Sequence, residues 1–425
     1  MIDIDLIRTT SKVVEDTLKR RNLQVKVPLV SQLKKADEEW RTLKSEIDDL
    51  RAQRNRVSQD INEAKKAGKD VKAVIAKAKK IPEEIEKKEK RCDALRTEID
   101  SLLLQIPNIL DKDVPAGKSA DDNKVVREWG KIPKFAFALK THTELCEALD
   151  IADFERSAKI SGRGFYFLKN ELMLLEQALI RFALDHLYKD NFTLSSVPYM
   201  MRKEPYNGVT DLAAFNDALY KVENDDQYLI ATSEHPLTAQ FMDEIIEEQQ
   251  LPIKRAALSV CFRKEAGGHG VDEKGLFRVH QFHKVEQVIL CKPEDSQKWH
   301  EHMLKNAEDI FKSLKLPYRV ILLCSADIGA VASKTYDLEV WMPRTQQYRE
   351  AVSCSNVKDY QARRLKIRYR TSDGTKTVHT LNSTAVATTR ALVAILENYQ
   401  QKDGSVKIPE ALWPYMSGIK EIRQN

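Results

Sequence analysis

The segment FRVHQFHKVE (277–286) places several chemically active side chains within one strand-like run. Successive side chains of a strand point to opposite faces. One face would therefore carry five groups that are unusual together, namely Arg278, His280, Phe282, Lys284 and Glu286. Three of them can be cationic, one is a flat ring and one is a carboxylate. This mixture indicates a surface built for a ligand, and the elements around it must explain which one.

Three histidines near this segment suggest zinc as one alternative, since His269, His280 and His283 lie within fifteen residues of each other. On a strand, however, His280 and His283 differ by an odd number of positions and face opposite ways. A zinc site is therefore the weaker interpretation, which metal analysis of the purified protein would test.

Two later segments also gather polar groups. The segment 337–356 (DLEVWMPRTQQYREAVSCSN) predicts a strand pair with acids and small polar residues, and 380–400 predicts a strand ending in Asn-Ser-Thr followed by a helix with Arg390 near its start. Helices and strands do not alternate as in a doubly wound sheet, and neither GxGxxG nor GxxxxGK[ST] occurs. Any nucleotide site would therefore not use a Rossmann or Walker scaffold.

The first hundred residues have a different pattern. Apolar residues recur three and four positions apart from Leu33 to Ala64, and again from Val71 to Ile106. Such seams predict two coiled-coil helices, and the break around Gly68 predicts an antiparallel hairpin over about 31–106. Pro82 predicts a kink or a restart of the second helix.

Charge is uneven along this hairpin, because residues 51–80 hold ten Lys or Arg against three acidic residues. A solvated coiled-coil surface or a dimerisation rod would explain such a run. A finger that contacts a phosphate backbone would explain it as well. The pattern alone does not separate these alternatives.

Composition sets wider limits. The chain has 425 residues, enough for two or three domains, and a net charge of +5 that is too small to indicate a nucleic-acid partner by itself. Its six cysteines form no CxxC pair, which favours a reducing compartment. The N-terminus lacks a signal-peptide pattern and no window of about 18 apolar residues occurs. We expect a cytoplasmic protein without a membrane span.

Taken together, 260–288, 337–356 and 380–400 resemble the motifs of the class II aminoacyl-tRNA synthetases, and specifically the seryl-tRNA synthetase family. The FRxE, GLFRVHQFxKxEQ and LNxT…TRALxAILENYQ patterns carry the resemblance, and it extends to the hairpin, to 160–202 and to YLIATSEHPL (228–237). It implies an α+β chain in which an N-terminal antiparallel helical coiled-coil arm precedes a class II catalytic domain, built on a mainly antiparallel β-sheet flanked by helices. The expected boundaries are 1–110 for the arm domain, 111–130 for a linker and 131–425 for the catalytic domain.

The resemblance implies a serine–tRNA ligase, which forms seryl-adenylate and pyrophosphate from L-serine and ATP and then loads the 3′ end of tRNA(Ser). Arg263 matches the arginine expected at the α-phosphate and the attacking carboxylate, and Arg390 the one at the γ-phosphate. Glu350 and Ser353 match the Mg²⁺ positions, and Phe282 the ring that stacks on adenine. The implied ATP contacts are Arg263, Lys264, Glu265, Val279, Phe282, Glu350, Ala351, Val352, Ser353 and Arg390.

The implied serine contacts are Thr232, Ser233, Glu234, Arg263, Glu286, Asn382 and Thr384. The implied tRNA contacts are Arg51, Arg54, Arg56, Lys65, Lys66, Lys69, Lys72 and Lys274. Judged singly, these residues have ordinary explanations as well: a buried arginine can pair with a core carboxylate, Phe282 can be a core ring, and 232–234 can begin a helix.

Three positions depart from the family pattern, namely Ser383, Arg344 and Val271. The first two bear on local backbone geometry and the third on an acceptor-stem contact. The rival hypotheses are a synthetase-like RNA-binding or regulatory protein without catalysis, and an enzyme that loads serine on another carrier. The family also implies a homodimer across 171–198 and makes selenocysteine tRNA a further candidate partner.

Overall fold

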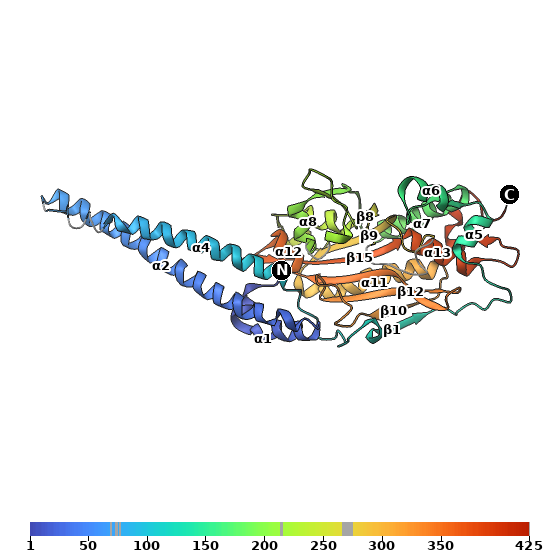
Figure 1. Ribbon diagram of the computed structural model, residues 1–425, viewed down its shortest axis with the longest axis horizontal. Coiled ribbons are helices and arrows are strands. Elements are labelled where there is room, and N and C mark those ends of the chain that lie inside the picture. Colours follow the sequence, from blue (N-terminus) through green and yellow to red (C-terminus); the bar gives the residue numbers. More distant parts are fainter. Residues whose placement is uncertain (69, 73–74, 76–77, 213–215, 266–274, 425) are drawn as a thin grey trace. The chain divides into compact units, whose positions relative to one another are not determined.

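The computed structural model describes most of the chain, as two compact units, Met1–Ile109 and Leu110–Asn425. The described residues are 1–68, 70–72, 75, 78–212, 216–265 and 275–424 (Figure 1). Four residues singled out in the sequence lie outside the described residues: Lys69, Val271, Lys274 and His269. No helix in the described ranges is long and apolar enough to cross a membrane.

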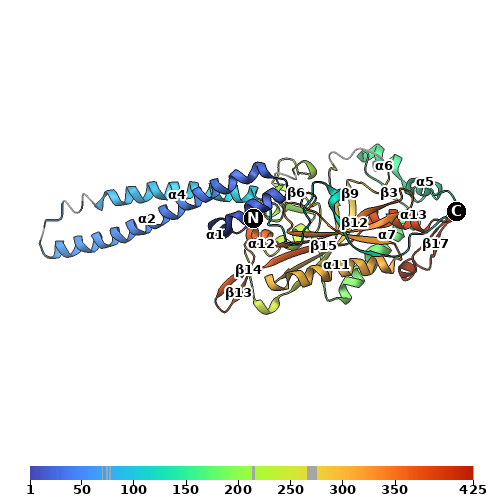
Figure 2. The same ribbon diagram turned by 90° about the horizontal axis from the view of Figure 1, so that it is seen from below.

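The N-terminal unit is a helical hairpin preceded by a shorter helix. Its helices are α1 (Ile4–Arg20), α2 (Val27–Lys66) and α4 (Lys80–Gln105). Ion pairs show that α2 and α4 run antiparallel, because partners later in α2 lie earlier in α4: Glu39 pairs with Arg91, and Glu46 pairs with Lys88. The predicted arm is therefore confirmed, and Figure 2 shows the two helices side by side.

The predicted apolar seam lies between these two helices. Its most buried members are Leu33, Ala36, Ile47, Ile81, Ile85, Cys92, Leu95 and Ile99. Pro82 falls in the first turn of α4, where a backbone N–H has no helical acceptor. Of the two predicted effects of Pro82, a kink or a restart of the helix, the structure shows the restart.

The C-terminal unit is built on an eight-stranded sheet in the order β1-β10-β11-β12-β15-β9-β8-β4. All neighbouring strands are antiparallel except β4 and β8, which confirms the predicted sheet type. The strands are β1 (Lys124–Trp129), β4 (Thr193–Ser196), β8 (Ile253–Phe262), β9 (Gln281–Cys291), β10 (Tyr318–Leu322), β11 (Lys334–Met342), β12 (Gln347–Lys358) and β15 (His379–Ala387).

Two details differ from the sequence expectations. Part of the segment expected to be a linker, 111–130, forms strand β1, which pairs with β10 at the edge of the sheet. The Asn-Ser-Thr triplet does not end its strand either. Strand β15 continues to Ala387, and helix α13 (Thr388–Tyr399) follows directly, with Arg390 in its first turn.

The sheet separates two apolar layers, and β9 shows how. Its odd-numbered residues Val285, Ile289 and Cys291 join the larger core, to which helices α7 (Asn170–Lys189), α11 (Ser296–Ser313) and α13 contribute. Its even-numbered residues Val288 and Leu290 join a smaller cluster. Helices α8 (Lys203–Val209), α10 (Glu234–Ala239) and α12 (Tyr360–Leu365) supply side chains to that second layer. The period of two predicted for this strand is thus present.

Four register shifts interrupt the pairing of the described strands of this sheet, and two of them, in β12 and β15, bear on the site. Leu338 pairs with Val352 and Glu339 with Glu350, so Ala351 is an extra residue in β12. Thr384 pairs with Glu286 and Val386 with Val285, so Ala385 is an extra residue in β15. An extra residue changes which side chains share a face beyond it.

Candidate active site

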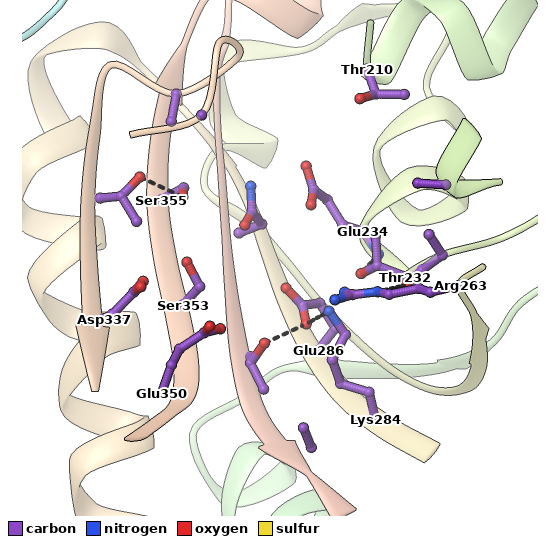
Figure 3. A pocket seen from close by; sticks show the side chains of 18 of the residues that line it. Thr210, Thr232, Glu234, Arg263, Lys284, Glu286, Asp337, Glu350, Ser353 and Ser355 are labelled. Atoms are coloured by element: carbon purple, nitrogen blue, oxygen red, sulfur yellow. Dashed lines mark hydrogen bonds and ion pairs between the residues drawn. The ribbon is translucent and has the colours of Figure 1, made fainter. Parts of the chain in front are cut away.

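A cavity of about 700 Å³ lies on the even-numbered face of β9. Its walls come from β9, β11, β12, β15, the start of α10 and the first turn of α13 (Figure 3). Thirteen of the residues expected to bind serine or ATP line it: Thr232, Glu234, Arg263, Glu265, Val279, Phe282, Glu286, Glu350, Ala351, Ser353, Asn382, Thr384 and Arg390. Segments more than 150 residues apart in the sequence therefore converge on one cavity.

Three expected residues are not among those lining the cavity. The Ser233 side chain is buried and donates to the carbonyl of Ala257 at 3.4 Å. Val352 packs in the larger core. Lys264 is exposed, with its ammonium 5.8 Å from the centre of the Tyr220 ring. Ser383 also faces away, since it pairs with Gln287 on the odd-numbered side of β9.

One wall holds a buried ion pair. The Lys284 ammonium lies 2.7 Å from Oε2 of Glu286, and the Thr384 hydroxyl donates to the same oxygen at 3.2 Å. All three residues are buried, and Thr384 stands directly opposite Glu286 in the ladder between β15 and β9. Lys284 was not among the expected site residues, although its even position in β9 had placed it on the correct face.

Glu234 begins α10 at the edge of the same wall. Its backbone N–H donates to Oγ1 of Thr232 at 3.2 Å, so Thr232 caps this helix as well as lining the cavity. Its carboxylate accepts from Nε2 of Gln361 at 2.8 Å. Burial, together with the nearby Glu286 charge, raises the pKa of Glu234 to about 7. Gln361 was not predicted from the sequence.

Two arginines also line the cavity, and Figure 3 shows one of them, Arg263, beside Lys284 and Glu286. The Arg263 guanidinium stacks 5.2 Å from the centre of the Phe282 ring, and its Nε donates to the Ala231 carbonyl at 3.4 Å. Arg390 stacks 4.3 Å from the centre of the Phe277 ring and donates to the carbonyls of Phe277 and Glu350. Burial lowers the pKa of Arg390. Aromatic rings and backbone carbonyls thus hold both guanidinium groups at the cavity wall.

An acidic corner lies on β11 and β12. Glu350 and Ser353 are three residues apart and would face opposite ways in a regular strand, but the bulge at Ala351 lets both line the cavity. Asp337 stands directly opposite Ser353, and its buried Oδ1 has no partner among the described residues. Burial, and then the Glu350 charge, raises the pKa of Asp337. Asp337 was another residue that the sequence analysis missed.

The histidines of the opening segment have separate partners. Nδ1 of His280 lies 2.8 Å from the carbonyl of Arg263, and the ring stacks on Phe165. Nδ1 of His283 lies on the other face, 3.2 Å from Glu176 of α7, which raises the pKa of His283. Across the described ranges, no three residues of the types that bind zinc are grouped closely enough to hold an ion.

Six of the eight expected tRNA contacts lie in the described part of the N-terminal unit. Arg51, Arg54, Arg56, Lys65, Lys66 and Lys72 are all exposed on or just beyond α2. Arg51 forms ion pairs with Glu89 at 2.7 Å and with Asp48 at 3.4 Å. The other five form no ion pair with a described residue of the hairpin.

Comparison with known proteins places this geometry in a family. The model of the seryl-tRNA synthetase N-terminal domain matches residues 1–110, and that of the tRNA synthetase class II core domain (G, H, P, S and T) matches residues 220–399. The serine–tRNA ligase of Methanocella arvoryzae is 51% identical, covering 99% of this chain and 100% of that protein. The serine–tRNA ligase of Pyrococcus furiosus is 48% identical, with 99% and 97% covered.

Solved structures agree with these relatives. The crystal structure of seryl-tRNA synthetase from Pyrococcus horikoshii complexed with ATP has a TM-score of 0.95 at 45% identity, with both chains fully covered. The cytoplasmic serine–tRNA ligase from Naegleria fowleri in complex with AMP has a TM-score of 0.90 at 34% identity, covering 100% of this chain and 99% of that one. The fold over the whole chain is therefore shared with these structures, and this chain belongs to the seryl-tRNA synthetase family of class II aminoacyl-tRNA synthetases.

Proposed function

We propose that this chain is a serine–tRNA ligase that activates L-serine with ATP and transfers the seryl group to the 3′ end of tRNA(Ser). The observation that carries the proposal is the combination of charges in one cavity, which is lined by the cations Arg263 and Arg390 and by the carboxylates Glu234 and Glu286. Serine has an anionic and a cationic end, and ATP is anionic. The cavity therefore matches both substrates in charge.

In the activation step, the serine carboxylate attacks the α-phosphorus of ATP and pyrophosphate leaves. Two anions must approach each other, so fixed positive charge at the reacting atoms lowers the barrier. We assign this role to Arg263, whose planar fork can hold a carboxylate and a phosphate oxygen together. Stacking on Phe282 holds the guanidinium in place. We assign Arg390 to the terminal phosphates and Phe282 to the adenine ring.

Mg²⁺ fits the acidic corner of the cavity. Glu350, Ser353 and Asp337 offer the oxygen ligands that this ion prefers, and the partnerless Oδ1 of Asp337 lacks a counter-charge. We propose that Glu350 and Ser353 would hold the ion. When bound, Mg²⁺ would neutralise charge on the phosphate oxygens. The buried Oδ1 of Asp337, which has no hydrogen-bond partner among the described residues, is the feature of this chain that supports a cation here.

Serine recognition follows from the opposite wall. We propose that Glu286 and Thr384 bind the hydroxyl, with Asn382 beside them, and that Glu234 and Thr232 lie near the ammonium. A wall of paired polar groups penalises alanine, because its methyl would leave buried groups without partners. Threonine would have to be excluded by the space available for one extra methyl. The buried pair Lys284–Glu286 keeps a carboxylate acceptor in place for the hydroxyl.

For the second step, we propose that the basic half of the hairpin binds the phosphate backbone of tRNA. The exposure of its cations supports this role. Lys69 and Lys274 remain expected contacts, and selenocysteine tRNA is a second possible substrate because it would be loaded with serine by the same chemistry. Since these substrates belong to translation, we expect the protein to act in the cytoplasm.

We also propose a homodimer across α7 and β4. β4 is the edge strand of the sheet, and apolar side chains are exposed on these two elements, namely Met173, Leu174, Tyr188 and Leu194. A partner surface would remove them from water. Light scattering of the unchanged protein and of a Leu174→Asp variant tests this point. A monomer in both samples would contradict it.

The central test is serine-dependent exchange of pyrophosphate into ATP, assayed with serine, threonine and alanine. We expect exchange with serine and far less with the other two. A well-folded protein without exchange would favour the non-catalytic, RNA-binding alternative. If exchange occurs but tRNA(Ser) is not charged, serine would be loaded on another carrier.

A further inference from the structure

Gln361 links three separate elements just outside the cavity. This side chain of α12 is 1% exposed. Its Nε2 donates to Oε1 of Glu234 at 2.8 Å and to the Val209 carbonyl at 2.9 Å. Its Oε1 accepts from the hydroxyl of Thr380 at 2.7 Å. Thr380 lies on β15, two residues before Asn382, so Gln361 connects the start of α10 to the strand that lines the serine side.

These contacts fix the orientation of the amide. The Val209 carbonyl can only accept a hydrogen bond, so the NH₂ end of Gln361 must face it. The same NH₂ group then points its second hydrogen at Glu234. The Thr380 hydroxyl donates to the other end, and a flipped amide would place the Gln361 oxygen against two acceptors, the Val209 carbonyl and the Glu234 carboxylate. The donor to Glu234 is therefore set by the surrounding protein.

Gln361 holds Glu234 without neutralising it. The charged groups around Glu234 are Glu286 and Lys284 on β9 and Arg263 beyond β8. Lys284 is committed to Glu286 at 2.7 Å, and His235, the neighbour of Glu234, is buried with its pKa lowered to about 3. An amide orients the carboxylate through one oxygen, whereas a lysine would also cancel its charge. Glu286 has a cation beside it and Glu234 has an amide, which suggests different tasks.

We propose that Gln361, supported by Thr380, is a positioning residue that holds one oxygen of Glu234 so that the other can receive the ammonium group of serine. The inference rests on the proposed function. It adds a distinction between the two carboxylates that recognise serine. Glu286, proposed to bind the hydroxyl, is paired with Lys284 within the protein. Glu234, proposed to bind the ammonium, would receive its cation from the substrate.

The first test is Gln361→Met, which keeps the volume and removes the donor. Loss of a hydrogen bond to a charged group should raise the KM for serine roughly ten- to a hundredfold in pyrophosphate exchange. The KM for ATP should change less than about twofold, because no ATP position touches Gln361. Gln400→Met is the matched control, since Gln400 is also buried and makes three side-chain hydrogen bonds, on Lys140 and Glu397, outside the cavity.

The second test is Gln361→Glu, which keeps the shape and replaces the two N–H donors of the amide with one O–H when protonated and none when ionised. Two carboxyl groups at hydrogen-bond distance cannot both ionise easily, so the new group must be protonated to donate to Glu234. At low pH the variant should therefore approach the unchanged protein, and the ratio of their serine KM values should rise with pH. A purely structural role would not produce this pH dependence. Gln400→Glu should show a flat ratio.

The outcomes separate the two claims. If the unchanged protein gives no exchange, the proposed function fails and the inference falls with it. If the unchanged protein gives exchange but Gln361→Met raises both KM values equally or matches Gln400→Met, only the inference is overturned. A pH-independent ratio for Gln361→Glu overturns it as well, and this isosteric variant decides the question if Gln361→Met does not fold.

Discussion

The hairpin and the cavity use the same charged residue types in opposite ways. On α2 and α4, pairs such as Glu39–Arg91 lie at the surface, with about half of each side chain exposed. In the cavity, Lys284 and Glu286 form their pair at 8% and 2% exposure. Surface pairs contribute little to stability, whereas breaking a buried pair leaves a charge without compensation. Exposure, more than residue type, thus sets what each charge does.

This difference predicts how each region responds to substitution. Exposed cations act by their number, through long-range attraction that salt screens. Buried groups act by their position, since each has few alternatives for its partner. The hairpin should therefore tolerate single changes and lose function gradually. The cavity should fail at single positions.

The largest expected effect is that of Arg263→Lys. Lysine keeps the charge but cannot form the planar two-point contact, so kcat/KM for serine-dependent exchange should fall at least about a hundredfold. Arg370→Lys serves as the control, because Arg370 is exposed and pairs with Glu247 at 3.1 Å. A loss below about fivefold for Arg263→Lys would remove it from the activation step.

The next effect is on stability, in Glu234→Gln. The pKa of Glu234 is raised from 4.5 in the unfolded chain to about 7 in the fold, so its contribution to stability is fully present below pH 4.5 and is lost as the pH rises through 7. Replacing it with neutral glutamine should therefore stabilise the C-terminal unit at pH 8, by roughly 3 kcal/mol, and much less at pH 5. Thermal melting at both pH values measures this. An equal change in melting temperature at pH 5 and pH 8 would contradict the assignment of Glu234 as a buried, titrating carboxylate. Serine binding should weaken in the variant at both pH values.

A smaller and graded effect is expected on the hairpin. Changing five exposed cations to glutamine (Arg54, Arg56, Lys65, Lys66 and Lys72) should reduce the salt dependence of tRNA binding by about one unit of slope per lost phosphate contact. Exchange should be unaffected. Five exposed lysines elsewhere in this unit provide the control, namely Lys12, Lys19, Lys34, Lys35 and Lys44. Equal slopes in both variants would mean that the basic half has no special role.

The smallest effect is expected for Arg91→Gln. Arg91 makes a two-point contact with Glu39 on the exposed side of the hairpin. Its loss should leave the thermal midpoint unchanged within error, because solvent replaces both partners. Ile85→Ala should instead lower the midpoint clearly, since Ile85 is 6% exposed in the seam. If Arg91→Gln lowers the thermal midpoint more than Ile85→Ala does, exposure does not determine how much each residue contributes to stability.

The sequence predicted the parts of this molecule that depend on local pattern. The hairpin seam and the restart at Pro82 follow from heptad spacing and proline chemistry. The face of β9 follows from a period of two, and thirteen site residues follow from motif resemblance. Strand β1 was missed because an edge strand of six mostly exposed residues has no apolar alternation.

The missed site residues share a physical reason. Asp337, Lys284 and Gln361 gain their significance from partners that are distant in sequence or set by the sheet register. Gln361 contacts Glu234, Val209 and Thr380, which lie on other elements of the fold, so no local sequence pattern predicts these hydrogen bonds. Conversely, Val352 matched the motif but packs in the core, because neighbouring side chains of a strand alternate and Ser353 faces the cavity.

The extra residue Ala351 makes the acidic corner depend on strand pairing as much as on side-chain chemistry. Glu350 and Ser353 share a face only because the bulge takes up one residue of the three-residue step between them. If Ala351 were paired in a regular ladder, Glu350 would turn to the opposite face from Ser353, beside the packed core. Deleting Ala351 would instead leave Glu350 and Ser353 two positions apart in a regular strand, still on one face. The bulge and its alanine therefore act as one unit, and an uninterrupted ladder keeps this corner only if the alanine is lost as well.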